Sequence, residues 1–292
     1  MVKYICYNWM PTIAQHAMDA SADFYNQAGA GTLHNHPPFD PYKVKDNDLI
    51  FVKTDYIVSG AFEKYALDKM YRRFNLITGV SSFNIGRDGT DSYKRILSHP
   101  NLKKWFCTNP PLNEEHSKIV PLPIGFEEPE RFGGNQSMLD KVFKQRTKRE
   151  QKKDKILLPY HDLSTNQDRR QLYDLLSKLD FVEVQNEKLP VDKYLNLLDE
   201  YKFVICLEGR GPDIHRNYES MLVGSIPINV NGVVNKIFNY HSIDGVFLNS
   251  WQELDEKIYK NILNKDYNIK KNDDFLLLKN HTQLVRRIIS EN

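Results

Sequence analysis

The 292-residue chain has few cysteines and no regular spacing between them. Cys6, Cys107 and Cys206 are far apart, and each lies in an apolar stretch. An odd number of cysteines without a spacing pattern argues against both a disulfide framework and a zinc site. We therefore expect three buried free thiols in a protein of a reducing compartment, the cytoplasm.

Long apolar runs and an excess of one charge are also absent. No apolar run approaches the ~18 residues that a membrane-spanning helix requires. Residues 1–8 turn polar too early for a signal peptide, so we expect a soluble chain without a transmembrane segment, whose sequons at Asn135 and Asn280 stay unmodified. The 40 basic and 38 acidic residues give a formal charge of +2, too small for a general attraction to nucleic acid.

Short apolar runs alternate with helical patterns, which is typical of parallel sheets covered by helices on both faces. The runs predict strands at 2–7, 48–53, 74–78, 104–107, 118–122, 156–159, 181–184, 202–207, 225–230 and 246–248. The helical patterns cover 12–27, 62–70, 164–178, 190–198, 250–263 and 275–289, and capping boxes at 164–167 and 250–253 mark two of the starts. The fold class is α/β, with two Rossmann-like doubly wound domains facing a cleft.

A change of composition separates the two halves. Gly133 and Gly134 interrupt the pattern, and eight lysines and arginines follow within residues 141–155. We expect an N-terminal domain at 1–135, a basic linker or helix at 136–154, a second domain at 155–270 and a C-terminal helix at 271–292. A basic run can bind nucleic acid or an acidic membrane, but it is more often a solvated helix or linker.

The strongest chemical signal follows the apolar strand at 202–207. It reads Glu208-Gly-Arg-Gly-Pro-Asp-Ile-His-Arg-Asn-Tyr-Glu219. Its glycines allow a ligand to approach the backbone closely, and Asp213 can cap the helix that follows. Arg216 and Glu219 are three apart and share one helix face. There the guanidinium is placed to clamp a diphosphate, and the carboxylate to accept bonds from ribose hydroxyls.

A second signal lies after the first strand of the same half. Tyr160 and His161 end that strand, and Arg169 and Arg170 fall in the first turn of the next helix. Two arginines there run against the preference of a helix N-terminus for acidic residues. An anion bound nearby would account for them, whereas plain solubility is the alternative.

These motifs resemble a known family. The segment Gly211-Pro-Asp-Ile-His-Arg-Asn-Tyr-Glu219, followed by Gly224-Ser-Ile-Pro-Ile228, resembles the donor-site signature of exostosin-like glycosyltransferases. In the first half, segments 48–55, 76–79, 104–109 and 121–125 resemble a related group found in bacteria and large DNA viruses. The likeness touches most of the chain, but only the C-terminal block is specific. If the chain is viral, the compartment is the host cytoplasm.

The resemblance implies the GT-B arrangement, with the donor nucleotide on the C-terminal domain and the acceptor on the other. The donor is then a nucleotide sugar, with UDP slightly favoured over GDP, and the acceptor is a glycan or another hydroxyl compound. Relatives carry an aspartate where Ser81 or Ser82 stands here, so no acidic role is transferred to that position. The expected donor-binding residues are Tyr160, His161, Thr165, Asn166, Arg169, Arg170, Glu208, Gly209, Arg210, Gly211, Asp213, His215, Arg216 and Glu219.

We expect no required cofactor or metal. Asp46-Asn-Asp48 has the spacing of a metal motif, but it precedes its strand and reads as a turn. His34 and His36 lack a third ligand, and Pro37-Pro38 makes their segment a loop that more plausibly faces substrate. The leaving diphosphate would instead be stabilised by arginines, and the candidates are Arg169, Arg170, Arg210 and Arg216.

An inverting transferase needs a base that accepts the proton of the acceptor hydroxyl. Asp55 directly follows the strand at 48–53 and is our first candidate, with His34 and Asp88 as alternatives. A retaining enzyme can do without such a base. Two other functions stay open: a non-catalytic module that binds a nucleotide or sugar, and a nucleic-acid binder that uses residues 141–155.

Overall fold

The computed structural model describes residues 2–19, 39–89, 91–112 and 115–291, and it divides the chain into two compact units. The N-terminal unit comprises Tyr7–Ile124 and His281–Asn292, and the C-terminal unit comprises Met1–Cys6 and Gly125–Asn280. The N-terminal end of the chain therefore belongs to the C-terminal unit, and the C-terminal end belongs to the N-terminal unit. The chain enters the C-terminal unit at Gly125, earlier than the expected boundary at 135.

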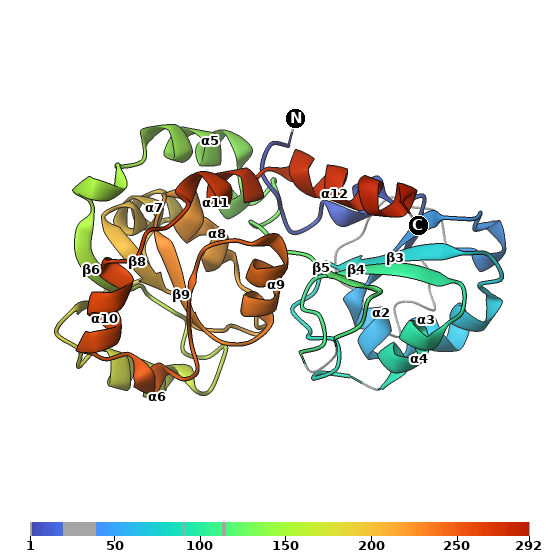
Figure 1. Cartoon of the computed structure of the whole chain (residues 1–292), viewed down its shortest axis with the longest axis horizontal. Helices are drawn as coiled ribbons and strands as arrows, with labels where there is room; N and C mark the ends of the chain where they lie inside the picture. Colours follow the sequence, from blue (N-terminus) through green and yellow to red (C-terminus); the bar gives the residue numbers. More distant parts are fainter. Residues whose placement is uncertain (1, 20–38, 90, 113–114, 292) are drawn as a thin grey trace. The chain divides into compact units, whose positions relative to one another are not determined.

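The N-terminal unit contains a five-stranded parallel sheet whose strand order follows the sequence (Figure 1). The strands are β1 (His16–Met18), β2 (Asp48–Lys53), β3 (Phe74–Gly79), β4 (Leu102–Cys107) and β5 (Ile119–Pro121). Its helices include α2 (Thr54–Val58), α3 (Ala61–Tyr65) and α4 (Ser92–Ser98). Four of the predicted strands are therefore confirmed within one or two residues.

Two predictions near the N-terminus are wrong. Residues 2–7 make only isolated bridges, from Tyr4 to Leu277 and from Cys6 to Phe126, and form no strand. The start of the predicted helix at 12–27 is a 3₁₀ turn, Met10–Ile13, followed by strand β1. The apolar residues at 13 and 17 suggested one helix face, but the backbone of β1 pairs with β2 instead. Residues 20–27 lie outside the described part of the chain.

The C-terminal unit contains a second five-stranded parallel sheet, in the order β10-β9-β8-β6-β7. These strands are β6 (Lys153–Leu158), β7 (Val182–Val184), β8 (Tyr201–Ile205), β9 (Ile226–Val230) and β10 (Val246–Leu248). The chain runs outward from β6 to β7 and then returns to β8 on the other side of β6. The strand order thus reverses between β6 and β8, which makes their carboxyl ends the topological switch point.

The helices of this unit lie on both faces of its sheet (Figure 1). They are α5 (Gln136–Gln145), α6 (Arg169–Leu176), α7 (Val191–Asp199), α8 (His215–Leu222), α9 (Val233–His241), α10 (Glu256–Leu263) and α11 (Ile269–Phe275). Successive residues of β6 enter different core clusters, Ile156 and Leu158 one and Leu157 the other, because side chains alternate along a strand. Two parallel α/β sheets confirm the predicted Rossmann-like fold class.

Neither predicted capping box forms the side-chain cap expected of its serine, although helices follow both boxes and Ser250 is the N-cap of a 3₁₀ helix, Trp251–Glu253. Helix α6 begins at Arg169, after Asp168, whose side chain makes no capping bond. Ser164 instead donates to Asp162, and this local turn replaces the expected cap. Helix α10 begins at Glu256, and the side chain of Asp255 accepts from Ile258 N–H at 2.7 Å. Helix α12 (Leu278–Ser290) confirms the predicted last helix.

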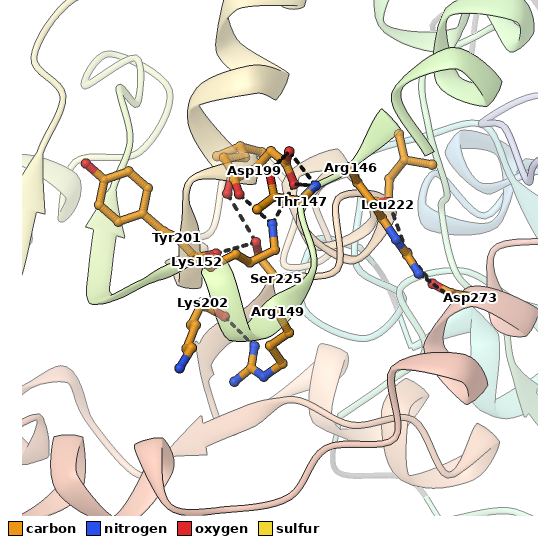
Figure 2. Close-up of polar contacts among 11 residues, drawn as sticks. Arg146, Thr147, Arg149, Lys152, Asp199, Tyr201, Lys202, Leu222, Ser225 and Asp273 are labelled. Atoms are coloured by element: carbon orange, nitrogen blue, oxygen red, sulfur yellow. Dashed lines mark hydrogen bonds and ion pairs between the residues drawn. The ribbon is translucent and has the colours of Figure 1, made fainter. Parts of the chain in front are cut away.

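The basic segment 136–154 lies within the C-terminal unit and is fastened to it (Figure 2). Arg146 pairs with Asp273 through two bonds of 2.6 and 2.7 Å. The buried ammonium of Lys152 lies 2.5 Å from an Asp199 carboxylate oxygen, and Thr147 N–H also binds that carboxylate. Six of the eight cations at 141–155 have protein partners: Lys144, Arg146, Arg149, Lys152, Lys153 and Lys155.

The three cysteines are free and buried, as predicted. Burial raises the pKa of Cys206 to about 12, so its thiol stays protonated at neutral pH. In the described part of the chain, no helix combines the length and the hydropathy that a bilayer crossing needs.

Candidate functional site

A cavity of about 370 Å³ opens in the C-terminal unit, among the loops that follow β6 and β7 and the first turns of α7 and α8. Its position at the carboxyl ends of β6, β7 and β8 places it at the topological switch point, where open α/β sheets bind ligands. Six of the predicted donor-binding residues line it: Tyr160, His161, Arg169, His215, Arg216 and Glu219.

Arg216 is held in the cavity wall by two hydrogen bonds. Its Nε donates to the hydroxyl of Tyr194 at 2.8 Å, and its Nη2 donates to the carbonyl oxygen of Tyr160 at 2.8 Å. Nη1 makes no hydrogen bond within the described residues. The guanidinium is therefore fixed in orientation and retains donors that can bind an anion.

Charges around Arg216 keep it protonated. Burial alone would lower its pKa, but the nearby Tyr194 and Glu219 raise the pKa above its usual value. Tyr194 donates its hydroxyl to Glu219 Oε2 at 3.0 Å, and burial raises the pKa of this phenol well above 10. Burial also raises the pKa of Glu219, against the opposing effect of Arg216. Arg216, Tyr194 and Glu219 thus form one connected polar network.

His161 is buried and has a partner at each ring nitrogen. Its Nδ1 lies 2.7 Å from the carbonyl oxygen of Pro159, and its Nε2 accepts from Leu207 N–H at 3.2 Å. Burial lowers the pKa of His161 well below its usual value, and the charges of Arg216 and Arg169 add to this effect. The neutral ring therefore joins the end of β6 to the end of β8, and neither nitrogen is left for a ligand.

The guanidinium of Arg169 is directed mainly at protein oxygens. Nε donates to Glu208 O at 2.8 Å, Nη2 donates to Leu207 O at 3.1 Å, and Nη1 donates to Asp162 O at 2.8 Å and to Thr165 Oγ1. Burial and the charge of Arg216 lower its pKa to about 10. Arg169 fastens the loop after β6 to the loop after β8, and one of its five N–H groups remains for a ligand.

Gly209 leaves room for the guanidinium of Arg169. A Cβ atom at Gly209 would lie 3.3 Å from Nη2 of Arg169 and 3.3 Å from Cγ2 of Ile214. The predicted close approach to this glycine therefore exists, but the approaching group is the protein's own arginine. Gly211 closes the same turn by accepting from Gly209 N–H at 3.1 Å.

The predicted helix cap at Asp213 is wrong. Helix α8 has Ile214 at its N-cap, without a side-chain capping bond. The buried carboxylate of Asp213 accepts from the Asn217 amide at 3.1 Å and from the Tyr218 hydroxyl at 2.5 Å. Asn217 in turn accepts from Asn229 of β9 at 3.0 Å. Asp213 thus holds α8 in position through hydrogen bonds from two buried side chains of that helix, instead of capping its N-terminus.

The remaining predicted donor residues lie outside the 370 Å³ cavity. Asn166 and Glu208 line a second cavity of about 490 Å³, which shares Arg169 with the first. Arg170 and Arg210 are exposed and line neither of these two cavities. A donor-binding role for these two residues stays a prediction.

Sequence reasoning missed three parts of the cavity lining. Tyr194 was predicted only as part of an apolar helix face, yet its hydroxyl joins Arg216 to Glu219. The loop after β7 contributes Gln185 and Leu189, and its place at the carboxyl end of a parallel strand could have identified it. Glu127 and Gly133 come from the segment where the chain enters the unit, and no local motif marks them.

In the N-terminal unit, Asp55 lies in the first turn of α2, directly after β2. Its Oδ1 lies 3.6 Å from Nζ of Lys53, which is only 4% exposed. Its Oδ2 is buried and has no hydrogen-bond partner. A buried carboxylate oxygen without a partner is uncommon, and it distinguishes Asp55 from a carboxylate whose oxygens are both engaged by the protein.

The other candidate bases fit less well. Asp88 binds Arg87 at 2.7 Å and accepts from Asn84 N–H at 2.7 Å. Burial raises its pKa, but these two bonds outweigh burial and lower the pKa overall, which makes Asp88 a weaker base. His34 lies outside the described residues, as does His36.

The acidic pair Asp46 and Asp48 at the start of β2 serves a turn, as predicted. Asp46 accepts from Arg73 N–H at 3.0 Å, and Asp48 accepts from Lys45 N–H at 2.8 Å. Asn47 between them has a positive φ of 69°. Within the described residues, no group of three or more His, Cys, Asp or Glu side chains is placed to hold a metal ion. Metal independence stays a prediction.

No protein-family model matches the chain, and no curated protein matches it. Among solved structures, the chain is similar to OtsA in its apo form, with a TM-score of 0.41 and 9% sequence identity. The match covers 80% of this chain and 69% of the OtsA chain. A likeness at this level carries no argument about activity, which is therefore argued from the residues of the site.

Proposed function

We propose that the chain is a glycosyltransferase of the exostosin-like GT-B kind, which moves a sugar from a nucleotide sugar to a hydroxyl of a glycan or another acceptor. The observation that carries this proposal is the arrangement around Arg216. Its guanidinium is oriented by Tyr194 and Tyr160, keeps Nη1 for a ligand and lies beside Glu219 in a cavity at the switch point.

The chemistry of the cavity favours a ligand that carries both phosphate and hydroxyl groups. A guanidinium binds phosphate oxygens through charge-assisted bonds, and a carboxylate accepts bonds from hydroxyls. Its volume of about 370 Å³ falls within the range of small-molecule sites. A nucleotide sugar combines these groups in one molecule, and the preference for UDP over GDP rests on the family resemblance alone.

The proposed reaction divides two tasks between the two units. In an inverting transfer, the acceptor oxygen forms a bond to the anomeric carbon while the bond from that carbon to the phosphate oxygen breaks. Asp55 takes the proton of the acceptor hydroxyl through its unpartnered Oδ2. Arg216 stabilises the charge that develops on the leaving nucleoside diphosphate, and we expect no metal for this step.

Two other functions are less well supported. A nucleic-acid binder would use the basic segment 141–155, but six of its eight cations already have partners within the C-terminal unit. A non-catalytic module would use the same cavity without turnover. The partnerless oxygen of Asp55 favours an enzyme, because a binding module has no use for it.

A thermal-shift screen with UDP, GDP, CMP and their sugars tests the proposal. Ligand present at about a hundred times its Kd raises the unfolding temperature of a protein of this size by roughly 5 °C or more. We expect UDP or GDP to do so and the matching nucleotide sugar to be consumed when acceptor is present. Failure of every nucleotide to stabilise the protein contradicts the proposal, whereas stabilisation without turnover indicates the non-catalytic module.

A further inference from the structure

Glu127 lines the same cavity as Arg216 and has no assigned role. Its carboxylate makes no hydrogen bond and no ion pair with any residue that the structure describes. Its charge reaches the site, because it contributes to the raised pKa of Glu219. A carboxylate that lines a ligand cavity without a protein partner is free to accept bonds from a ligand.

The backbone around Glu127 is fixed to helix α8. The carbonyl oxygen of Gly125 lies 2.7 Å from Nδ1 of His215, and the buried ring of Phe126 packs edge-on against Tyr218 with 6.5 Å between ring centroids. These contacts hold residues 125 and 126 against the first turn of α8. Glu127 follows them directly, so the position of its carboxylate relative to Arg216 is set by rigid elements.

Two glycines leave room for Glu127, Gly133 for its side chain and Gly134 for its backbone. A Cβ atom at Gly133 would lie 2.6 Å from Oε2 of Glu127, and one at Gly134 would lie 2.2 Å from the carbonyl oxygen of Glu127. Only glycine therefore fits at either position without displacing Glu127. This segment, which we call the Glu127 wall (residues 125–134), forms one side of the cavity.

The Glu127 wall and the α7 wall (residues 185–194) contact α8 through different residues. His215 binds Gly125 of the first wall, and Arg216 binds Tyr194 of the second. Successive residues of a helix point about 100° apart, so the two walls lie on different sides of α8. Arg216 lies between the two walls. A ligand whose phosphates bind Arg216 can therefore extend one end toward the Glu127 wall and the other end toward the α7 wall.

The two walls suit different chemical groups. The α7 wall offers the aliphatic side chains of Leu189 and Val191 and the amide of Gln185, which suit a flat base with polar edges. Its two charged lining residues, Glu187 and Lys188, are exposed to solvent. The Glu127 wall offers a carboxylate, which accepts bonds from hydroxyls and repels a further anion. In a nucleotide sugar, the base and the sugar lie at opposite ends of the diphosphate.

We propose that Glu127 binds a hydroxyl of the sugar moiety of the donor, so that the site binds the nucleotide sugar more tightly than the free nucleotide. The proposal rests on the proposed function of the cavity. Glu127 is then a specificity residue for the transferred group, whereas Glu219 and Arg216 bind the part of the donor that leaves.

The test compares Glu127→Ala with wild type by calorimetry, using UDP, UDP-glucose and UDP-N-acetylglucosamine, and GDP with GDP-mannose. We expect the affinity for the free nucleotide to change by less than about twofold, and the affinity for the nucleotide sugar to fall roughly tenfold, as loss of a charge-assisted bond implies. Glu130→Ala, an exposed glutamate of the same segment, is the matched control and should change neither affinity.

A second variant displaces the Glu127 carboxylate without removing it. Gly133→Ala places a methyl group 2.6 Å from the present position of Oε2 of Glu127, which displaces the carboxylate and should produce the same selective loss. If wild type and Glu127→Ala bind the nucleotide sugar with equal affinity, the inference is wrong but the proposed function stands. The same conclusion follows if Glu127→Ala loses affinity for the free nucleotide and for the nucleotide sugar to the same extent. If wild type binds none of the five probes, the proposed function fails and the inference fails with it.

Discussion

Arg216 and Arg169 line the same cavity, yet their guanidinium groups are engaged differently. Four of the five N–H groups of Arg169 bind protein oxygens, mostly backbone carbonyls at the ends of β6 and β8. Arg216 uses two donors and keeps both N–H groups of Nη1. The first arginine therefore builds the site and the second is available to the ligand, although both carry the same charge.

Asp55 provides the residue-scale prediction for the N-terminal unit. Asp55→Asn keeps the shape of the side chain but cannot accept a proton from the acceptor hydroxyl. We expect sugar transfer to slow by about a hundredfold to ten-thousandfold, with nucleotide affinity within twofold of wild type. Transfer rate and nucleotide affinity are measured on the same preparation, with folding checked by circular dichroism.

Asp91→Asn is the matched control, because its side chain is 77% exposed and pairs with Lys94 at the surface. It should transfer at the wild-type rate. Transfer by Asp55→Asn at that same rate would show that Asp55 is only a turn residue. Loss of nucleotide binding in Asp55→Asn would contradict the division of tasks between the two units.

At the scale of elements, the sequence predicted those strands and helices that are determined by local apolar periodicity. The apolar runs at 48–53 and 226–230 are strands buried on both faces, so few other structures suit them. The helix predicted at 12–27 failed because a short strand there gains its hydrogen bonds from β2, which no local pattern reveals. The predicted helix start at Ser164 was wrong for a similar reason, because the Ser164 hydroxyl binds the nearby Asp162 instead of capping a helix.

The candidate site could be predicted where residue type and strand position together decide the role. Arg216 and Glu219 follow a buried strand at a turn, and the structure places both in the cavity. The partners of Arg169 and Asp213 depend on which carbonyls and side chains the fold brings near them. Tyr194 and Glu127 reach the cavity from distant segments, so only the tertiary structure reveals them.

One carboxylate, Asp199 at the end of α7, binds two residues of segment 146–152 (Figure 2). Asp199 accepts from Thr147 N–H and Thr147 Oγ1 at 2.8 Å each and from the buried Lys152 ammonium at 2.5 Å. Asp199→Ala leaves that ammonium buried without its carboxylate. We expect a loss of about 3–5 kcal/mol in the free energy of unfolding, measured by urea titration.

Asp140→Ala is the control for this variant. Asp140 also accepts from two lysines, Lys3 and Lys144, but both ammonium groups are largely exposed. Exposed ion pairs contribute about 1 kcal/mol or less, so Asp140→Ala should stay close to wild type. Similar unfolding free energies for the two variants would show that the segment is a solvated linker after all.

At the scale of the whole molecule, each end of the chain completes the opposite unit. Residues 1–6 pair with the C-terminal unit through the bond from Ile5 N–H to Leu276 O at 2.9 Å. The N-terminal unit receives His281–Asn292 in return. Neither half of the sequence therefore contains a complete unit, and activity has to be measured on the full chain.

A prediction for the full chain concerns metal ions. The cavity of the proposed diphosphate site is lined by Arg169, Arg216 and Lys188, and in our account cationic side chains stabilise the leaving group without a metal ion. We expect transfer to continue at about its original rate after dialysis against EDTA. Complete loss of turnover, restored by manganese or magnesium, would contradict this account of charge stabilisation.

The central claim is that Arg216 binds the diphosphate of the donor, and calorimetric titration of UDP and GDP tests it most directly. Arg216→Ala should weaken the nucleotide that binds by about 2 kcal/mol or more, which is roughly thirtyfold in Kd. Arg72→Ala, an exposed arginine of the other unit, should leave the affinity unchanged. A folded Arg216→Ala protein that binds the nucleotide as tightly as wild type would contradict the claim.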